Sequence, residues 1–127
     1  MSSSIFDGVT KSVVHSQTVG RLPDIGHAIT AGAQSSDLIG NASYDEINLL
    51  VVPTTRLTDD FFNLSTGLAG EIIQKAANYH VRLAIIGDVA PYVNRSKAFA
   101  DFVRETNKGN AIWFVPDNPA LEAKLAV

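Results

Sequence analysis

The sequence predicts a single α/β domain, with a mostly parallel central sheet of four to five strands and helices on both faces. Two observations support this class. Short apolar runs that end at glycine or proline alternate with segments of helical periodicity, and no repeat or linker divides residues 1–127. Apolar residues make up 46% of the chain, which provides for a core, and cysteine is absent, so no disulfide supports it.

The first third of the chain gives the weakest pattern. A strand is expected over residues 11–19, and residues 1–10 are left open between a flexible segment and an extra edge strand. A short helix is expected to begin at Pro23, because proline suits the first helical turn and Asp24 adds a negative charge at its positive end. A further helical turn over residues 36–40 is expected to end at its glycine.

The middle third gives the clearest strand and helix. Residues 47–52 form an apolar run that Pro53 stops, which predicts a strand buried on both faces. Residues 59–64 are mixed in character and are expected to form a turn. The strongest helix begins after Ser65 and Thr66, where paired apolar residues recur every four positions.

The last third predicts two more strands, each followed by a helix. The strands are residues 82–86 and 111–115. Ser96 begins the helix after the first of them, and Gly109 is expected to end it in a left-handed conformation. Asp117 opens the final helix. The inner face of the helix after Ser96 is expected to contain Phe99, Phe102 and Val103.

Charge and hydropathy exclude several classes of protein. The net charge is −3 and the basic residues are scattered, so binding to nucleic acid or to an anionic membrane is not expected. The longest apolar runs are far shorter than the ~20 residues that span a bilayer. The first residues lack the pattern of a secretory signal, and the absence of cysteine fits a reducing compartment, so a cytoplasmic location is expected.

No catalytic, metal or cofactor motif is recognisable. His15, His27 and His80 have no ligand partner three or four residues away, so no metal site is expected. A nucleophile elbow and a phosphate-binding loop are both absent, so no cofactor is expected and a hydrolytic enzyme has the least support. The sequence therefore favours a binding or regulatory role over catalysis.

Three sets of polar residues are candidates for that role. At the start of the strong helix, Ser65 or Thr66 is either a helix cap or a phosphorylation switch, with Gly67 beside it. On the same helix a polar row forms either a solvated face or an interaction surface. This row consists of Glu71, Gln74, Lys75 and Asn78.

The third set follows the carboxyl ends of the strands, where ligands of open α/β sheets bind. These residues are candidates for a small-molecule or anion site, although Asn94 or Ser96 is equally suited to capping the next helix. The set consists of Arg56, Asp88, Asn94, Arg95 and Ser96.

The order of segments from residue 51 onward, with Ser65-Thr66-Gly67-Leu68 before a helix, resembles the STAS domain of anti-sigma-factor antagonists and sulfate transporters. This resemblance implies a STAS-like fold, phosphorylation of a hydroxyl beside the glycine, which is Thr66 here, and partner binding around the helix. Leu64 stands where that family has aspartate. The strings at residues 66–75 and 102–109 also resemble a bacterial family known as domain of unknown function 4180, which implies no activity.

The leading hypothesis is a non-enzymatic regulatory domain that binds a protein partner of unknown identity and is switched at Ser65 or Thr66. The alternative is a small-molecule or anion-binding domain whose site lies at the carboxyl ends of the strands. Association with further copies of the same chain is left open.

Overall fold

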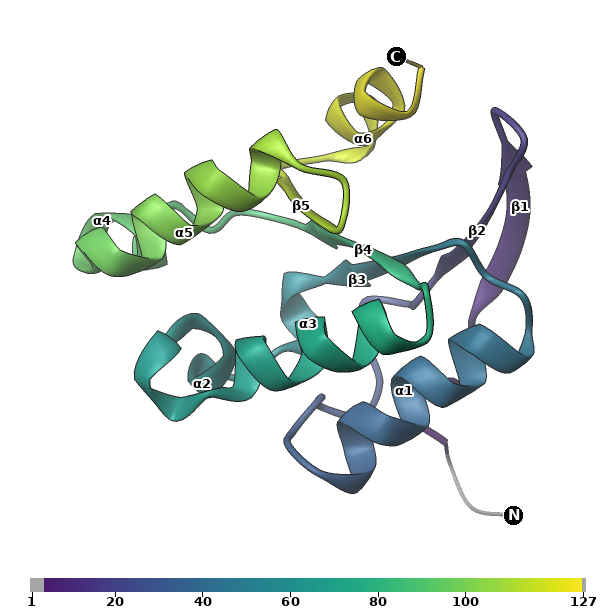
Figure 1. The fold of residues 1–127 in the computed structure, drawn as a ribbon, viewed down its shortest axis with the longest axis horizontal. Coiled ribbons are helices and arrows are strands. Elements are labelled where there is room, and N and C mark those ends of the chain that lie inside the picture. The colour runs from purple at the N-terminus through teal and green to yellow at the C-terminus, as the bar shows by residue number, and fades with distance from the viewer. Residues whose placement is uncertain (1–3, 127) are drawn as a thin grey trace.

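The computed structural model describes residues 4–126 and contains one five-stranded sheet (Figure 1). The strands lie side by side in sequence order, with β1 antiparallel to β2 and all other neighbours parallel. They are β1 (Thr10–Val14), β2 (Gln17–Arg21), β3 (Leu49–Pro53), β4 (Arg82–Ile86) and β5 (Ile112–Val115). This arrangement confirms the predicted α/β class and its mostly parallel sheet.

Long helices cover the two faces of the sheet unequally. On one face α1 (Ala33–Tyr44), α3 (Leu68–Asn78) and α5 (Lys97–Lys108) pack against alternate residues of the central strands. On the other face α6 (Asn118–Leu125) packs against the remaining strand residues. The predicted presence of helices on both faces is therefore confirmed.

Short elements connect the sheet to these helices at the carboxyl ends of the strands. After β3 come the 3₁₀ turn η1 (Thr54–Arg56), α2 (Asp59–Phe62) and the 3₁₀ turn η2 (Leu64–Thr66). After β4 comes α4 (Ala90–Arg95). Residues 59–64, expected to be a turn, thus form a short helix and the start of a 3₁₀ turn, and α4 had no sequence prediction.

The pleat of β3 explains its unbroken apolar run. Leu50 and Val52 point into the core beneath α1 and α3, whereas Leu49 and Val51 point toward α6. Each of these four side chains is at most 3% exposed. A strand covered on both faces has no solvent-facing position, so its sequence does not alternate.

The predicted strand over residues 11–19 is wrong, because that segment contains two strands and the turn between them. His15 and Ser16 form the turn with φ of 48° and 68°, the left-handed pair that joins a tight antiparallel hairpin. The edge strand is β1, so of residues 4–10, which the sequence left open between a flexible segment and an extra edge strand, only Thr10 belongs to a strand. Residues 1–3 lie outside the described part of the chain, and the turns that follow them bury Ile5.

The predicted helix at Pro23 is also wrong, because residues 22–32 form an irregular loop. Its apolar residues do not share a face: Ile25 is 90% exposed, whereas Ile29 is buried and forms a bridge with Leu57. The expected helical turn at residues 36–40 is the middle of the longer α1, which does not end at its glycine.

The remaining boundaries follow the sequence closely. β4 spans the predicted residues, Ser96 caps α5 by accepting a hydrogen bond from the Phe99 amide at 3.1 Å, and Asp117 caps α6. Gly109 ends α5 with φ of −96°, so the expected left-handed conformation is wrong. Among the described residues no helix is both long and apolar enough to cross a membrane.

Candidate functional site

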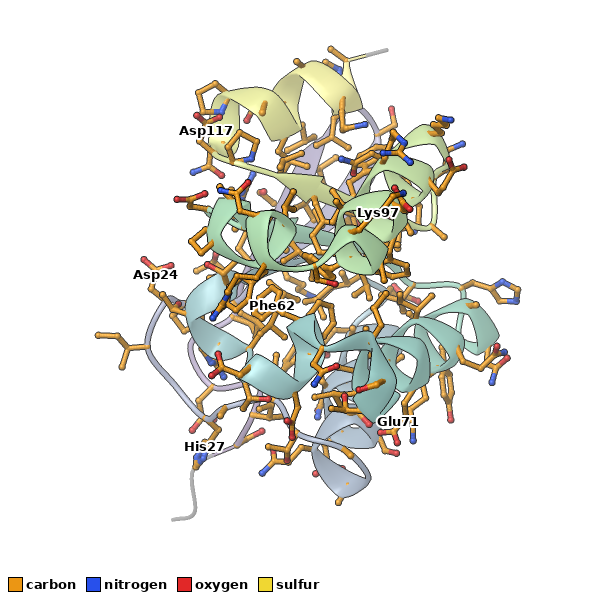
Figure 2. All side chains as sticks on the ribbon, turned by 90° about the vertical axis from the view of Figure 1, so that its left-hand side faces the viewer. Asp24, His27, Phe62, Glu71, Lys97 and Asp117 are labelled. Atoms are coloured by element: carbon orange, nitrogen blue, oxygen red, sulfur yellow. The ribbon has the colours of Figure 1, made fainter. Side chains whose placement is uncertain are left out.

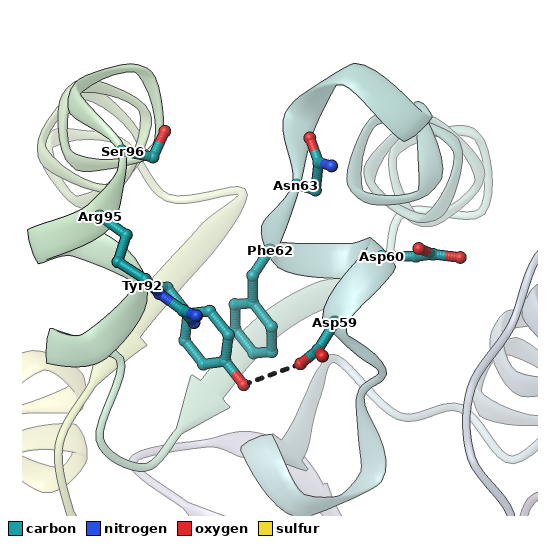
Figure 3. Close-up of a pocket in the computed structure, with 7 residues that line it drawn as sticks. All are labelled: Asp59, Asp60, Phe62, Asn63, Tyr92, Arg95 and Ser96. Atoms are coloured by element: carbon teal, nitrogen blue, oxygen red, sulfur yellow. Dashed lines mark hydrogen bonds between the residues drawn. The ribbon is translucent and has the colours of Figure 1, made fainter.

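A pocket of about 260 Å³ opens between α2 and α4 at the carboxyl ends of β3 and β4 (Figure 3). We call it the Tyr92 pocket. Two consecutive crossover connections supply its walls, so the order of strands in the sheet determines its position. Its lining consists of Asp59, Asp60, Phe62, Asn63, Tyr92, Arg95 and Ser96.

Two stacked rings form the inner wall of this pocket. The rings of Phe62 and Tyr92 lie nearly parallel, with centroids 3.9 Å apart. Phe62 is only 4% exposed, and its other aromatic neighbours are Phe61 and Phe99, both packed edge-to-face (Figure 2). Tyr92 therefore rests on a fixed part of the core.

The polar end of Tyr92 faces a carboxylate. Its hydroxyl donates a hydrogen bond to Asp59 at 3.3 Å, as Figure 3 shows. Burial and, second, the negative charge of Asp59 raise the pKa of Tyr92 above its usual value. The phenol therefore remains a neutral donor across the physiological range and does not become a base.

Arg95 provides positive charge at the mouth of the pocket. Its guanidinium carbon lies 5.0 Å from the centroid of the Tyr92 ring, and its Nε donates to the Pro91 carbonyl. Within residues 4–126 all ion pairs lie on α5, so Arg95 has no carboxylate partner there. An exposed Arg beside a half-buried Tyr combines two residue types that are enriched in protein interfaces.

The predicted hydroxyl pair lies directly beside this pocket. Asn63, a lining residue, accepts hydrogen bonds from the amide and the hydroxyl of Ser65 at 3.2 and 2.7 Å. The hydroxyl of Thr66 contacts the Asp60 carbonyl at 2.6 Å. Both side chains are exposed.

The cap of α3 differs from the expected Ser or Thr cap. Gly67 is the N-cap residue, with φ of 82°, and it has no side chain to accept from the helix. The Thr66 hydroxyl accepts instead from the amide of Leu68 at 3.3 Å. The glycine is needed at this position because its backbone is left-handed.

The predicted polar row of α3 is divided between two roles. Glu71 accepts from the Ser35 hydroxyl at 2.6 Å and from the Gly32 amide at 2.8 Å, so it ties α3 to α1 (Figure 2). Lys75 adds a bond of 2.7 Å to the hydroxyl of Ser36. The other two members, Gln74 and Asn78, are exposed and bind each other at 3.1 Å.

These contacts predict how acid affects stability through Glu71. Its hydrogen bond from Ser35 and, second, its bond from Gly32 lower the pKa of Glu71. A carboxylate with a lowered folded pKa stabilises the protein above its unfolded pKa of ~4.3, and this contribution is lost as the pH falls through the folded value. Glu71→Gln should therefore be less stable than the wild type at pH 7, and the difference should shrink below pH ~4.

Urea denaturation of both proteins at neutral and acid pH measures this difference. Glu122→Gln, at an exposed glutamate of α6, is the matched control and should leave the denaturation midpoint unchanged at each pH. A constant gap between Glu71→Gln and the wild type across that range would contradict the assigned role.

The structure does not bring the five predicted strand-end residues together. Arg56 is 1% exposed, and its side chain donates only to backbone carbonyls. Asp88 accepts from the amide of Ala90 at 2.9 Å and, with Asn94, lines a separate pocket of about 340 Å³ between α4 and α5. Arg95 and Ser96 line the Tyr92 pocket, and Ser96 also caps α5.

The sequence reasoning missed the aromatic and acidic walls of the Tyr92 pocket. Phe62 and Asp59 lie in a segment without clear periodicity, and Tyr92 lies in a helix of six residues. The adjacency of two acids and two phenylalanines at residues 59–62 was the available signal. Within the described part of the chain no group of three or more His, Asp or Glu residues is placed to hold a metal ion.

Comparison with known proteins gives a family match. The family model described as "Domain of unknown function (DUF4180)" matches residues 14–125, which is nearly the whole described chain. Searches of curated proteins and of solved structures give no significant match.

Proposed function

The chain belongs to the DUF4180 family, and from that premise we propose that it is a non-enzymatic regulatory domain that binds another protein. We place it in the bacterial cytoplasm and assign it a STAS-like arrangement. The proposed contact surface comprises the Tyr92 pocket and the exposed hydroxyls of Ser65 and Thr66. Phosphorylation at either hydroxyl is proposed to switch the binding.

One observation carries the proposal: Asn63 belongs both to the pocket and to the hydroxyl pair. Its side chain lines the pocket and accepts both hydrogen bonds from Ser65. A phosphate on Ser65 would remove the hydroxyl donor and add about two negative charges beside Asn63. The pocket and its partner surface would therefore change together.

The chemistry of the pocket suits a protein partner. The ring of Tyr92 is held in place by its stack on Phe62. Arg95 lies beside it and has no carboxylate partner within residues 4–126. Tyr and Arg are enriched among the residues that dominate interface energies. A partner with a carboxylate or a backbone carbonyl at this position would pair with Arg95 and cover Tyr92.

The test compares proteins captured from native-host lysate by the wild type and by matched variants. Arg95→Glu reverses charge in the pocket, and Ser65→Glu places an acid at the switch. Lys11→Glu and Ser12→Glu make the same changes on β1, far from the pocket. We expect one protein to be retained by the wild type and both controls and depleted about tenfold by Arg95→Glu and Ser65→Glu, the loss for one disrupted interface contact.

Equal capture by all five proteins would contradict the proposal. Circular dichroism of each variant establishes that it folds.

The second candidate, a small-molecule domain, is favoured by the apolar pocket between α4 and α5, where Val89, Val93 and Phe114 surround a space of about 340 Å³.

A further inference from the structure

A larger pocket lies at the opposite end of the strands, where they begin. It has a volume of about 520 Å³. Arg82 opens β4 and Trp113 is the second residue of β5, so the amino ends of two neighbouring strands form its floor. Lys124 of α6 and Lys108 at the end of α5 also line it, together with Asn107 and Asn110.

Two cations flank the tryptophan of this pocket. The guanidinium carbon of Arg82 lies 4.5 Å from the centroid of the Trp113 ring, and the ammonium of Lys124 lies 5.0 Å from it. The indole NH donates to the Gly109 carbonyl at 2.7 Å, which holds the ring in place. Trp113 is 5% exposed, so it fixes the position of both charges.

Neither of these cations has a carboxylate partner in the described part of the chain. Arg82 donates to the Asn110 carbonyl and to the amide oxygen of Gln17, both at 2.7 Å, and Lys124 donates to the Asn107 carbonyl at 3.2 Å. All of these acceptors are neutral. Burial lowers the pKa of Arg82, which shows that its charge is held at a desolvation cost.

The lining of the pocket contains three cations and no acid, although the chain as a whole carries a net charge of −3. One of the three, the exposed Lys108, pairs with Glu105 on the same helix at 3.4 Å, so Arg82 and Lys124 are the half-buried cations left without an acid among the described residues. Half-buried charges in proteins are normally compensated by an opposite charge. The overall negative charge disfavours a long polyanion such as nucleic acid, because the rest of the surface repels it. A small anion is therefore the occupant that this charge distribution fits.

We propose that the pocket around Arg82, Trp113 and Lys124 binds a small organic dianion, and that its class is a phosphate monoester. Two fixed positive charges match the two negative charges of a phosphate monoester, and the carboxamide of Asn110 supplies a neutral hydrogen-bonding group at the lining. The carboxamide of Asn107 is paired with the backbone NH and carbonyl of Phe114. The volume lies within the range of small-molecule sites. This site is independent of the Tyr92 pocket, which lies at the carboxyl ends of the strands.

The chain has a single tryptophan, so its fluorescence reports on this pocket alone. The full chain is titrated with adenosine monophosphate, inorganic phosphate and citrate, and calorimetry on the same mixtures gives a second measure of binding. Lys124→Gln removes one flanking charge, and Lys97→Gln is the matched control because Lys97 is an exposed lysine of α5 outside the pocket.

We expect saturable binding of adenosine monophosphate, about tenfold weaker in Lys124→Gln and within about twofold of the wild type in Lys97→Gln. Tighter binding of the monophosphate than of inorganic phosphate would support the organic ester as the ligand class. Tighter binding of citrate than of either phosphate would overturn that class. Absence of saturable binding by all three probes at millimolar concentration, or equal weakening by the two lysine variants, would overturn the site itself.

Discussion

Arg56→Ala should lower the free energy of unfolding by about 3–5 kcal/mol, because three backbone carbonyls lose a charged donor and each unpaired buried group costs about 1–3 kcal/mol. The guanidinium is 1% exposed and donates to the carbonyls of His27, Pro23 and Ile5 at 2.9, 3.1 and 3.0 Å. The variant leaves these carbonyls without their donors and opens a cavity beneath the loop at residues 22–32. The loop closes so tightly that a Cβ on Gly26 would lie 2.6 Å from the guanidinium carbon.

Chemical denaturation measures the loss. Arg104→Ala is the matched control, because this arginine lies on the exposed side of α5 and its ion pair with Asp101 should contribute less than about 1 kcal/mol. Arg56→Lys keeps the charge but cannot reach three diverging carbonyls, so it should fall between the wild type and Arg56→Ala. A loss below about 1 kcal/mol for Arg56→Ala would mean that the loop does not depend on this side chain.

Phe99→Ala should cost a similar amount, about 3–5 kcal/mol, through the cavity that a missing ring leaves. Phe99 is fully buried and meets Phe62 and Phe114 edge-to-face, with centroids 5.7 and 5.8 Å apart. It thus joins α5 to both α2 and β5. Because Phe62 is also the base of the Tyr92 pocket, the same change should loosen that pocket.

The neighbouring ring provides the comparison. Phe102 was predicted to face the core beside Phe99, and the structure leaves it half-buried at the edge of the same cluster. Phe102→Ala should therefore cost clearly less than Phe99→Ala in the same denaturation assay. A larger cost for Phe102→Ala would show that the inner face of α5 is rotated from the one described.

The sequence predicts the last two-thirds of the fold well because its signals there are local. The strands β3 and β5 are unbroken apolar runs, β4 is apolar after its first residue, and α3 and α5 have one apolar face each. The first third fails because its hairpin turn uses His15 and Ser16, which lack the glycine or asparagine that marks such turns. The loop at residues 22–32 was predicted wrongly because the side chain that holds it, Arg56, is distant in the sequence.

The distinction between local signals and contacts from distant residues also applies to the candidate sites. The cap formed by Ser96 is encoded locally and was predicted, whereas the contacts of Glu71 with Ser35 and Gly32 cross between two helices. Arg56 was assigned to a ligand site because it follows a strand, but its actual partners are 29 to 51 residues away. A polar residue in a single sequence gives no sign that its partner is a backbone carbonyl of a remote loop.

The unequal covering of the sheet has a consequence for the order of folding. Among the described residues, Leu121 and Leu125 of α6 supply the helical cover for Val19, Leu49, Val51 and Ala84. During synthesis that apolar surface has no cover until residues 118–125 have emerged, while the opposite layer can already assemble. The nascent chain is therefore most prone to aggregation just before its last helix docks, and a chaperone would find its apolar target on that face of the sheet.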